Sequence, residues 1–148
     1  MAATAKWYGR GLLAIAKKEV SWTADAIKVL IASSGYTPDQ DAHDYLDDVV
    51  ANEISGTNYT AGGLLLTSTA ATYDSATNRC RLTAANALWT DVTFSNGRYG
   101  IIYNSTPSTN ATRPLLGYVD FGGNQSPSAI NFQITWDTTD GVLYLAAA

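Results

Sequence analysis

Short segments in which apolar and polar residues alternate, or in which apolar residues form brief runs, cover most of this chain. The clearest alternation runs from Asn131 to Trp136, where Phe132, Ile134 and Trp136 fall on one face of an extended strand. A mostly apolar segment, Ile27 to Ile31, in which Lys28 is the one polar residue, predicts a buried strand. Further strands are predicted at Val49 to Ile54, Leu64 to Thr69, Ala71 to Asp74, Arg79 to Thr83, Ala87 to Phe94, Arg98 to Tyr103, Leu115 to Phe121, Ile130 to Trp136 and Val142 to Ala146.

Clusters of Gly, Asn, Asp, Ser and Thr separate these segments, as turns require. The strands recur at a spacing of ~8 to 12 residues with no helix between them, which favours antiparallel connections. The pattern therefore predicts a mainly β protein, built as an antiparallel β-sandwich or a jelly-roll-like barrel.

Two segments predict helices. Trp7, Tyr8, Leu12 and Ile15 recur at helical spacing and indicate a short N-terminal helix. Five of the eleven aspartates lie between Asp39 and Asp48, directly after Pro38. Proline suits the first turn of a helix and aspartate complements its exposed N–H groups, so one short helix of one or two turns is expected there.

The length of 148 residues fits a single β-rich domain, residues 1–148. Residues 1–6 are small and featureless, and we expect them to form a short mobile N-terminal arm. The polar residues agree with β structure, because 18 Thr and 11 Ser stand against only 4 Lys and 2 Glu.

Charge and hydropathy argue against two classes of partner. The net charge is −4, and all four lysines precede Val29, whereas a nucleic-acid binder needs a basic face. The longest apolar stretches, such as Gly62 to Leu66, fall far short of the ~20 residues of a membrane helix. No charged start followed by an apolar run marks a secretion signal. We expect neither nucleic acid nor membrane as a partner.

The residues that support catalysis are scarce. His43 is the only histidine and lies in the acidic segment, where we expect an exposed position at a helix end; no G-x-S-x-G elbow accompanies it. Cys80 is flanked by Arg79 and Arg81, but strand geometry points both arginines to the opposite face, so a buried structural cysteine is expected. We predict no catalytic residues and no enzyme.

The acidic segment could suggest a calcium loop, because Asp39, Asp41 and Asp44 supply oxygen ligands. It lacks the central glycine and terminal glutamate of an EF-hand, so capping of backbone N–H groups by these carboxylates is the favoured interpretation. No metal and no cofactor is predicted.

Aromatic residues are frequent for a chain with so little charge, and they suit half-buried sheet faces and protein interfaces alike. We expect most of them in the core and a few at an oligomer contact. They are Trp7, Tyr8, Trp22, Tyr36, Tyr45, Tyr59, Tyr73, Trp89, Tyr99, Tyr103, Tyr118, Trp136 and Tyr144.

Several segments, spread over nearly the whole chain, share a resemblance. They are Lys6 to Gly9, Ala26 to Val29, Tyr36 to His43, Asn52 to Thr57, Tyr59 to Gly63, Arg98 to Tyr103, Pro114 to Gly122 and Trp136-Asp137. Taken together, they resemble a family of small structural proteins of tailed-bacteriophage virions. The resemblance implies an assembly role in the virion, after synthesis in the host cytoplasm, and implies no catalytic residues.

Within that family role, the leading expectation is a capsid decoration (cement) protein that binds and stabilises the assembled head. Its partners would be the major capsid protein or other virion proteins, and other copies of itself in a homo-oligomer, expected as a trimer. The candidate interface combines the N-terminal arm with the acidic segment: Lys6, Trp7, Tyr8, Asp39, Asp41 and Asp44.

Two alternatives stay open. One is a tail, neck or fibre-attachment component of the virion, including a receptor-binding piece. The other is a carbohydrate-binding module, in which an exposed aromatic residue such as Trp89 or Tyr103 would form the platform for a sugar.

Overall fold

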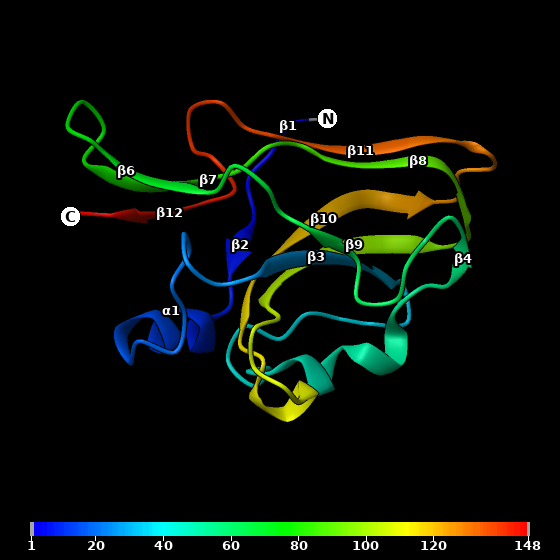
Figure 1. The fold of residues 1–148 in the computed structure, drawn as a ribbon, viewed down its shortest axis with the longest axis horizontal. Coiled ribbons are helices and arrows are strands. Elements are labelled where there is room, and N and C mark those ends of the chain that lie inside the picture. Colours follow the sequence, from blue (N-terminus) through cyan, green and yellow to red (C-terminus); the bar gives the residue numbers. More distant parts are fainter. Residues whose placement is uncertain (1, 148) are drawn as a thin grey trace.

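The computed structural model describes residues 2–147 and shows a mainly β protein (Figure 1). Three mostly antiparallel sheets are accompanied by one N-terminal α-helix and short 3-10 turns. In chain order the elements are β1 (Ala2–Ala3), β2 (Lys6–Trp7), α1 (Gly9–Ala16), β3 (Ile27–Ser33), η1 (Leu46–Asp48), η2 (Val50–Asn52), β4 (Gly56–Thr57), β5 (Leu64–Leu65), β6 (Ala70–Asp74), β7 (Arg79–Thr83), β8 (Ala87–Phe94), β9 (Gly97–Asn104), η3 (Asn110–Thr112), β10 (Leu115–Gln125), β11 (Ile130–Trp136) and β12 (Leu143–Ala146).

The two larger sheets face each other in a sandwich-like arrangement. One has the strand order β2-β10-β9-β3-β5 and the other β1-β11-β8-β4, while β12-β7-β6 form a smaller third sheet. Each sheet ends in two edge strands, so the described residues form no closed barrel, and the barrel alternative is wrong. Side chains from both larger sheets, such as Val29, Trp89, Phe121 and Trp136, meet in what we call the inter-sheet core.

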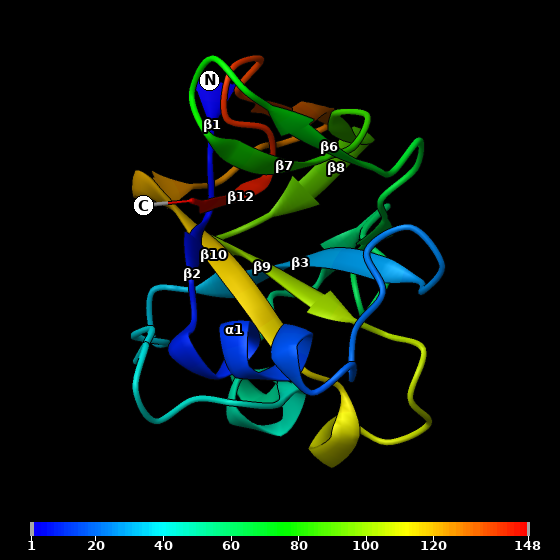
Figure 2. The same cartoon turned by 90° about the vertical axis from the view of Figure 1, so that its left-hand side faces the viewer.

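The five-stranded sheet is also covered on its other face. There α1 and the chain between β3 and β4 lie against it, as Figures 1 and 2 show from two sides. We call the apolar cluster under this cover the tyrosine core. Its buried members are Tyr8, Leu30, Ala32, Tyr36, Leu46, Val49, Ile101, Tyr103 and Leu115. Because both faces of the sheet are buried, β3 is apolar at every position except Lys28 and Ser33, which explains the mostly apolar segment from Ile27.

Most predicted strands are confirmed, several to the residue, but two are corrected. Val49 to Ile54 is not a strand: Val49 has helical backbone angles, and Val50–Asn52 form a 3-10 turn. Of Leu64 to Thr69, only Leu64–Leu65 pair as a strand, and Ser68 takes the left-handed conformation (φ 52°) that ends extended pairing. Of the apolar residues in the first segment, Val49 packs in the tyrosine core, Ile54 packs in the inter-sheet core and Val50 is exposed.

The predicted acidic helix is shorter and later than expected. Residues 39–44 form turns, and the helical part is the pair of 3-10 turns that begins at Leu46. The Oδ1 atom of Asp39 accepts N–H groups of Asp41 and Ala42, each at 3.0 Å. Such local side-chain bonds compete with a continuous helix.

The N-terminal segment is not a mobile arm over its described part. Ala2–Ala3 pair in parallel with β11, and Lys6–Trp7 pair antiparallel with β10. Ala3 and Ala5 are buried, and the Ala5 N–H donates to the Val142 carbonyl at 2.8 Å. Small residues facing inward therefore let one segment join both large sheets. Met1, which the prediction also included, lies outside the described residues.

Helix α1 begins at Gly9 rather than Trp7, because Trp7 belongs to β2. It packs unusually close to β10: a Cβ atom on Gly11 would meet the carbonyl oxygens of Leu115 and Leu116 at 2.7 Å. Glycine is therefore required at the contact. Within residues 2–147, no helix has the length and apolarity needed to cross a membrane.

Candidate functional site

The structure brings the two halves of the candidate interface together. Gly9 N–H donates to the Gln40 carbonyl at 2.9 Å, and the Gln40 side-chain amide donates to the Trp7 carbonyl at 2.5 Å. The Arg10 Nε–H donates to the Asp41 carbonyl at 3.3 Å. These bonds fix the acidic segment, residues 39–48, beside the start of α1. We call this combined surface the α1 face.

Five of the six predicted interface residues have accessible surface. Lys6, Asp39 and Asp41 are exposed, and Trp7 and Asp44 are half-buried. Tyr8 differs, because its side chain has no exposed surface and lies in the tyrosine core. It supports the α1 face from below and is not available to a partner in this conformation.

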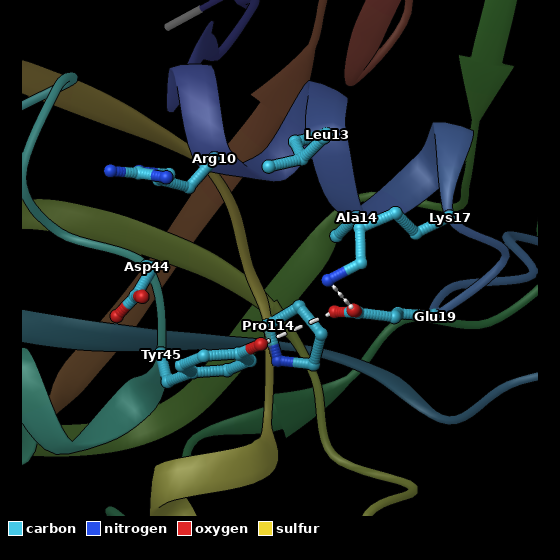
Figure 3. A pocket seen from close by; sticks show the side chains of 8 residues that line it. All are labelled: Arg10, Leu13, Ala14, Lys17, Glu19, Asp44, Tyr45 and Pro114. Carbon is cyan, nitrogen blue, oxygen red and sulfur yellow. Dashed lines mark hydrogen bonds and ion pairs between the residues drawn. The ribbon is translucent and has the colours of Figure 1, made fainter.

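A cleft of about 110 Å³ separates α1 from the acidic segment (Figure 3). Arg10, Leu13, Ala14 and Lys17 line it from the helix, and Glu19, Asp44, Tyr45 and Pro114 line it from the opposite side. At one end, Glu19 pairs with Lys17 at 2.7 Å and accepts the Tyr45 hydroxyl at 3.4 Å. The hydrogen bond to Glu19 raises the pKa of Lys17, so the lysine is charged at neutral pH.

The opposite end of the cleft carries a different pair of charged residues. Arg10 and Asp44 lie there, as Figure 3 shows, and no ion pair of the described residues joins them. The cleft thus has opposite charges on its two walls, over a floor that includes apolar side chains.

Two apolar residues on α1 were not predicted as part of the site. Leu12 and Leu13 are 41% and 46% exposed, while Gly11 and Ala14 face the sheet. Leu12 contributed to the helical spacing that predicted this helix, but it was not among the candidate interface residues. The spacing of Gly11 and Ala14 could have predicted that Leu12 and Leu13 are exposed. Small residues three positions apart mark the side of a helix that packs closely against its neighbour.

A chain of hydrogen bonds connects the tyrosine core to the acidic segment. The hydroxyl oxygens of Tyr8 and Tyr36 are 2.8 Å apart, and the Tyr36 hydroxyl lies 2.7 Å from His43 Nδ1. The Asp39 N–H also donates to Nδ1, at 3.1 Å. A backbone N–H can only donate, so Nδ1 is the acceptor, Tyr36 donates to it and Tyr8 donates to Tyr36.

The prediction that His43 is exposed at a helix end is therefore wrong. Its ring is half-buried and stacks on Tyr36 with centroids 5.2 Å apart. Burial raises the pKa of Tyr36 to about 12 and that of Tyr8 further still, so both hydroxyls keep their protons at neutral pH. The geometry assigns His43 the role of an anchor for the acidic segment.

The aspartates of the acidic segment cap turns, as the sequence predicts. The two backbone N–H groups bonded to Asp39 lower the pKa of its carboxyl group, and the Asp48 carboxylate accepts the Asp44 N–H at 2.9 Å. Among residues 2–147, no three His, Cys, Asp or Glu side chains are grouped so that they could hold a metal ion.

The candidate thiol, Cys80, and its two arginine neighbours lie away from the α1 face. Cys80 is half-buried on β7, less buried than predicted. Arg79 forms an ion pair with Asp140, and Arg81 donates to the Thr139 carbonyl at 3.0 Å. Both arginines thus bond to groups of the segment before β12.

The two aromatic residues suggested as sugar platforms are buried. Trp89 is 2% exposed and Tyr103 is 1% exposed. Trp89 stacks on Tyr59 between the two sheets, and the Tyr103 hydroxyl donates to the Gly62 carbonyl at 2.6 Å. Neither ring can offer a face to a ligand in this conformation.

Comparisons with family models, with curated proteins and with solved structures find no match for this chain.

Proposed function

We propose that this chain is a bacteriophage virion structural protein, bound to the assembled head as a decoration protein. The observation that carries the proposal is the α1 face, where Leu12 and Leu13 are exposed and Leu13 lines a cleft with charged residues on both walls. An apolar centre with a charged rim is typical of protein interfaces. The family resemblance described above names the kind of assembly.

The fixed conformation of this face suits a protein whose role is to bind and not to catalyse a reaction. α1 is fixed to the sheet through Gly11, and the acidic segment is fixed to α1 and to the Tyr36 and His43 side chains. A preorganised surface loses little conformational entropy on binding. When several copies bind neighbouring capsid subunits, weak single contacts become durable because the effective concentration is high.

Purified virions of the virus that encodes this chain test the proposal. A decoration protein is present at hundreds of copies per head and lies on the outer capsid surface in images of the particle. A count of a few to a dozen copies would instead support the tail, neck or fibre-attachment alternative. Absence of this protein from the particle would overturn both the decoration role and the tail, neck or fibre-attachment alternative.

Binding of the isolated protein to undecorated heads tests the face itself. We expect Leu13→Glu to weaken binding by at least about tenfold, because it places a charge in the apolar centre of the contact. Leu88→Glu is the matched control, since Leu88 is similarly exposed (42%) but lies on β8. Equal effects of the two variants would rule out the α1 face as the capsid contact.

No observation favours the carbohydrate-binding alternative. The aromatic residues suggested for it are buried, so replacing Trp89 or Tyr103 would measure folding rather than sugar binding.

A further inference from the structure

The small third sheet ends in the longest edge strand of the described residues. Of the six strands that end a sheet, β1, β2, β4 and β5 have two residues each, β12 has four and β6 has five. The middle of β6, which is Ala71, Thr72 and Tyr73, is exposed at all three positions. Among the described strands β6 pairs only with β7, so every second residue of β6 directs its backbone N–H and C=O groups away from the sheet.

The usual devices that protect an edge strand from further pairing are missing from β6. Such strands commonly carry lysine, proline, an inward-pointing charge or a β-bulge. The sequence of β6 is Ala-Ala-Thr-Tyr-Asp, in which only the last residue is charged. It pairs with β7 over all five residues without a register shift. This edge is therefore able to accept another extended chain.

We propose that β6 pairs antiparallel with β6 of a second copy of this chain, about a two-fold axis at Thr72. The two small sheets then join into one sheet with the strand order β12-β7-β6-β6-β7-β12. The contact goes beyond the proposed function and uses a different surface. Figures 1 and 2 both place β6 apart from α1, so the α1 face stays free for the capsid.

The residues of β6 complement one another about Thr72. A two-fold contact uses the same residues on both subunits, so the strand must fit itself. An axis at Thr72 pairs Tyr73 of each copy with Ala71 of the other, and the largest side chain of the strand thus meets one of the smallest. Thr72 then lies opposite Thr72, a cross-strand pair that stabilises antiparallel sheets.

The apolar face of the third sheet becomes continuous in this arrangement. Tyr73 lies opposite Cys80 on β7, and Cys80 lies opposite Leu145 on β12, so the three side chains form one row on one face. Cys80 and Leu145 pack against the inter-sheet core, whereas Tyr73 is 61% exposed. In the dimer this row continues from Tyr73 onto Ala71 of the second copy, and apolar surface is removed from water.

The other edge of the third sheet is not open to the same pairing. Trp7 Nε1–H donates to the Tyr144 carbonyl at 2.7 Å, and the Ala5 N–H donates to the Val142 carbonyl at 2.8 Å. The N-terminal segment thus bonds to the chain at the start of β12, where a copy added head to tail would have to bind. A closed pair of β6 strands remains, and it predicts a dimer in contrast with the trimer expected from the sequence.

A second copy also suits this edge better than a disordered segment of another protein. The β6 strand of the second copy is already extended and held by β7. It therefore loses less conformational entropy on pairing than a segment that must first become ordered.

Sedimentation velocity of the purified protein at increasing concentration tests the inference without virions. Five residues from each copy make a small contact, so we expect a weak dimer that is populated at about 0.1 to 1 mM. Thr72→Lys and Thr72→Glu each place two like charges opposite each other, and each should raise the dissociation constant at least about tenfold. Thr90→Lys, at an exposed threonine on β8, is the matched control and should leave the dimer intact.

A mixture of the Thr72→Lys and Thr72→Glu proteins is the decisive arm. Residue 72 of one copy lies opposite residue 72 of the other only if the axis passes through it, so the opposite charges should restore dimers as heterodimers. In the parent protein, amide hydrogen exchange within β6 should slow as the concentration rises, because the outward N–H groups gain partners. Far-UV circular dichroism and thermal midpoints confirm that the variants fold.

Four outcomes would overturn the inference: a monomer at about 1 mM, a trimer, a dimer that Thr72→Lys leaves unchanged, or a mixture of the two variants that stays monomeric. These outcomes leave the virion proposal standing, because the count of copies in the particle is an independent measurement. Conversely, a dimer with the expected response to charge, but no copies in virions, would support the contact at β6 and contradict the decoration role.

Discussion

The inter-sheet core and the tyrosine core of this protein contain different kinds of side chain. The inter-sheet core lies between two regular sheets and is filled by aliphatic, phenylalanine and tryptophan side chains. The tyrosine core lies between a sheet and an irregular stretch of chain, and three of its buried residues are tyrosines, with Tyr99 and Tyr118 packed at its margin. The same five-stranded sheet serves as a wall of both.

This difference follows from the backbone that each core must cover. Regular strands satisfy their own N–H and C=O groups, so apolar side chains suffice between them. Irregular chain leaves polar groups without ladder partners, and tyrosine can bury its ring while its hydroxyl bonds to them. Tyr103 does this at the Gly62 carbonyl, whereas Tyr36 bonds to the His43 side chain, which in turn accepts the Asp39 backbone N–H.

The largest expected effect comes from raising the pH, which should weaken the tyrosine core. Burial raises the pKa of Tyr36 and of Tyr103 to about 12, against about 10 in the unfolded chain. Their stabilisation is therefore complete below pH about 10 and is lost as the pH rises through about 12, in total on the order of 5 kcal/mol. Urea unfolding followed by tyrosinate absorbance measures this loss. Ionisation of these tyrosines near pH 10 in the folded protein would contradict the prediction.

Trp136→Ala should break the inter-sheet core by itself. Trp136 is 5% exposed, and its Nε1–H donates to the Ala85 carbonyl at 3.1 Å. Removing the ring leaves a cavity and an unpaired carbonyl, so the free energy of unfolding should fall by about 3–5 kcal/mol. Leu88→Ala on the outer side of the same sheet is the control, and equilibrium denaturation compares the two. A loss below about 1 kcal/mol for Trp136→Ala would show that the sheets do not pack as described.

A smaller effect is expected from Tyr36→Phe, which removes the central hydroxyl of the chain between Tyr8 and His43. The Tyr8 hydroxyl then lacks its partner in a buried site, and stability should fall by about 1–3 kcal/mol. Hydrogen exchange should quicken at the Asp39 N–H, because His43 loses part of its support. Tyr73→Phe, at an exposed ring on β6, should change stability by no more than a few tenths of a kcal/mol.

The smallest effect is expected from Asp39, whose carboxyl group caps a turn in the acidic segment beside the tyrosine core. Two backbone N–H groups lower the pKa of Asp39, so its stabilisation is present above the unfolded pKa of about 3.9 and is lost as the pH falls through the lower folded value. Asp39→Asn should therefore be slightly less stable than the parent at pH 7, with the difference shrinking in acid. Thermal midpoints between pH 7 and pH 2 measure it, and a difference that grows in acid would refute the sign.

Local pattern was sufficient to predict the inter-sheet core. Phe132, Ile134 and Trp136 face inward as their period of two predicts, with Phe132 half-buried and the other two buried. The boundaries of β7, β8 and β11 match the predicted ones. These segments lie in sheets, where alternation follows directly from the pleat.

The tyrosine core and the α1 face could not be predicted in the same way. Val49 and Leu46 look like strand or helix residues, but they are buried because irregular chain folds over the sheet, which no period records. The bond between Gln40 and Trp7 joins residues 33 apart in sequence. His43 shows the consequence: its role depends on Tyr36 and Tyr8, which only the tertiary fold brings to it.

The pairing of the N-terminal segment with β10 and β11 also constrains the order in which the chain folds. Residues 2–7 pair with strands that begin more than a hundred residues later, and Ala5 bonds to Val142. During synthesis, neither large sheet can gain this edge strand until β10 and β11 have left the ribosome. Contacts of such sequence separation slow folding and leave β edges unpaired meanwhile. The capture of residues 2–7 is therefore expected to come late in folding, and the sheet edges that they cover stay open to aggregation until it happens.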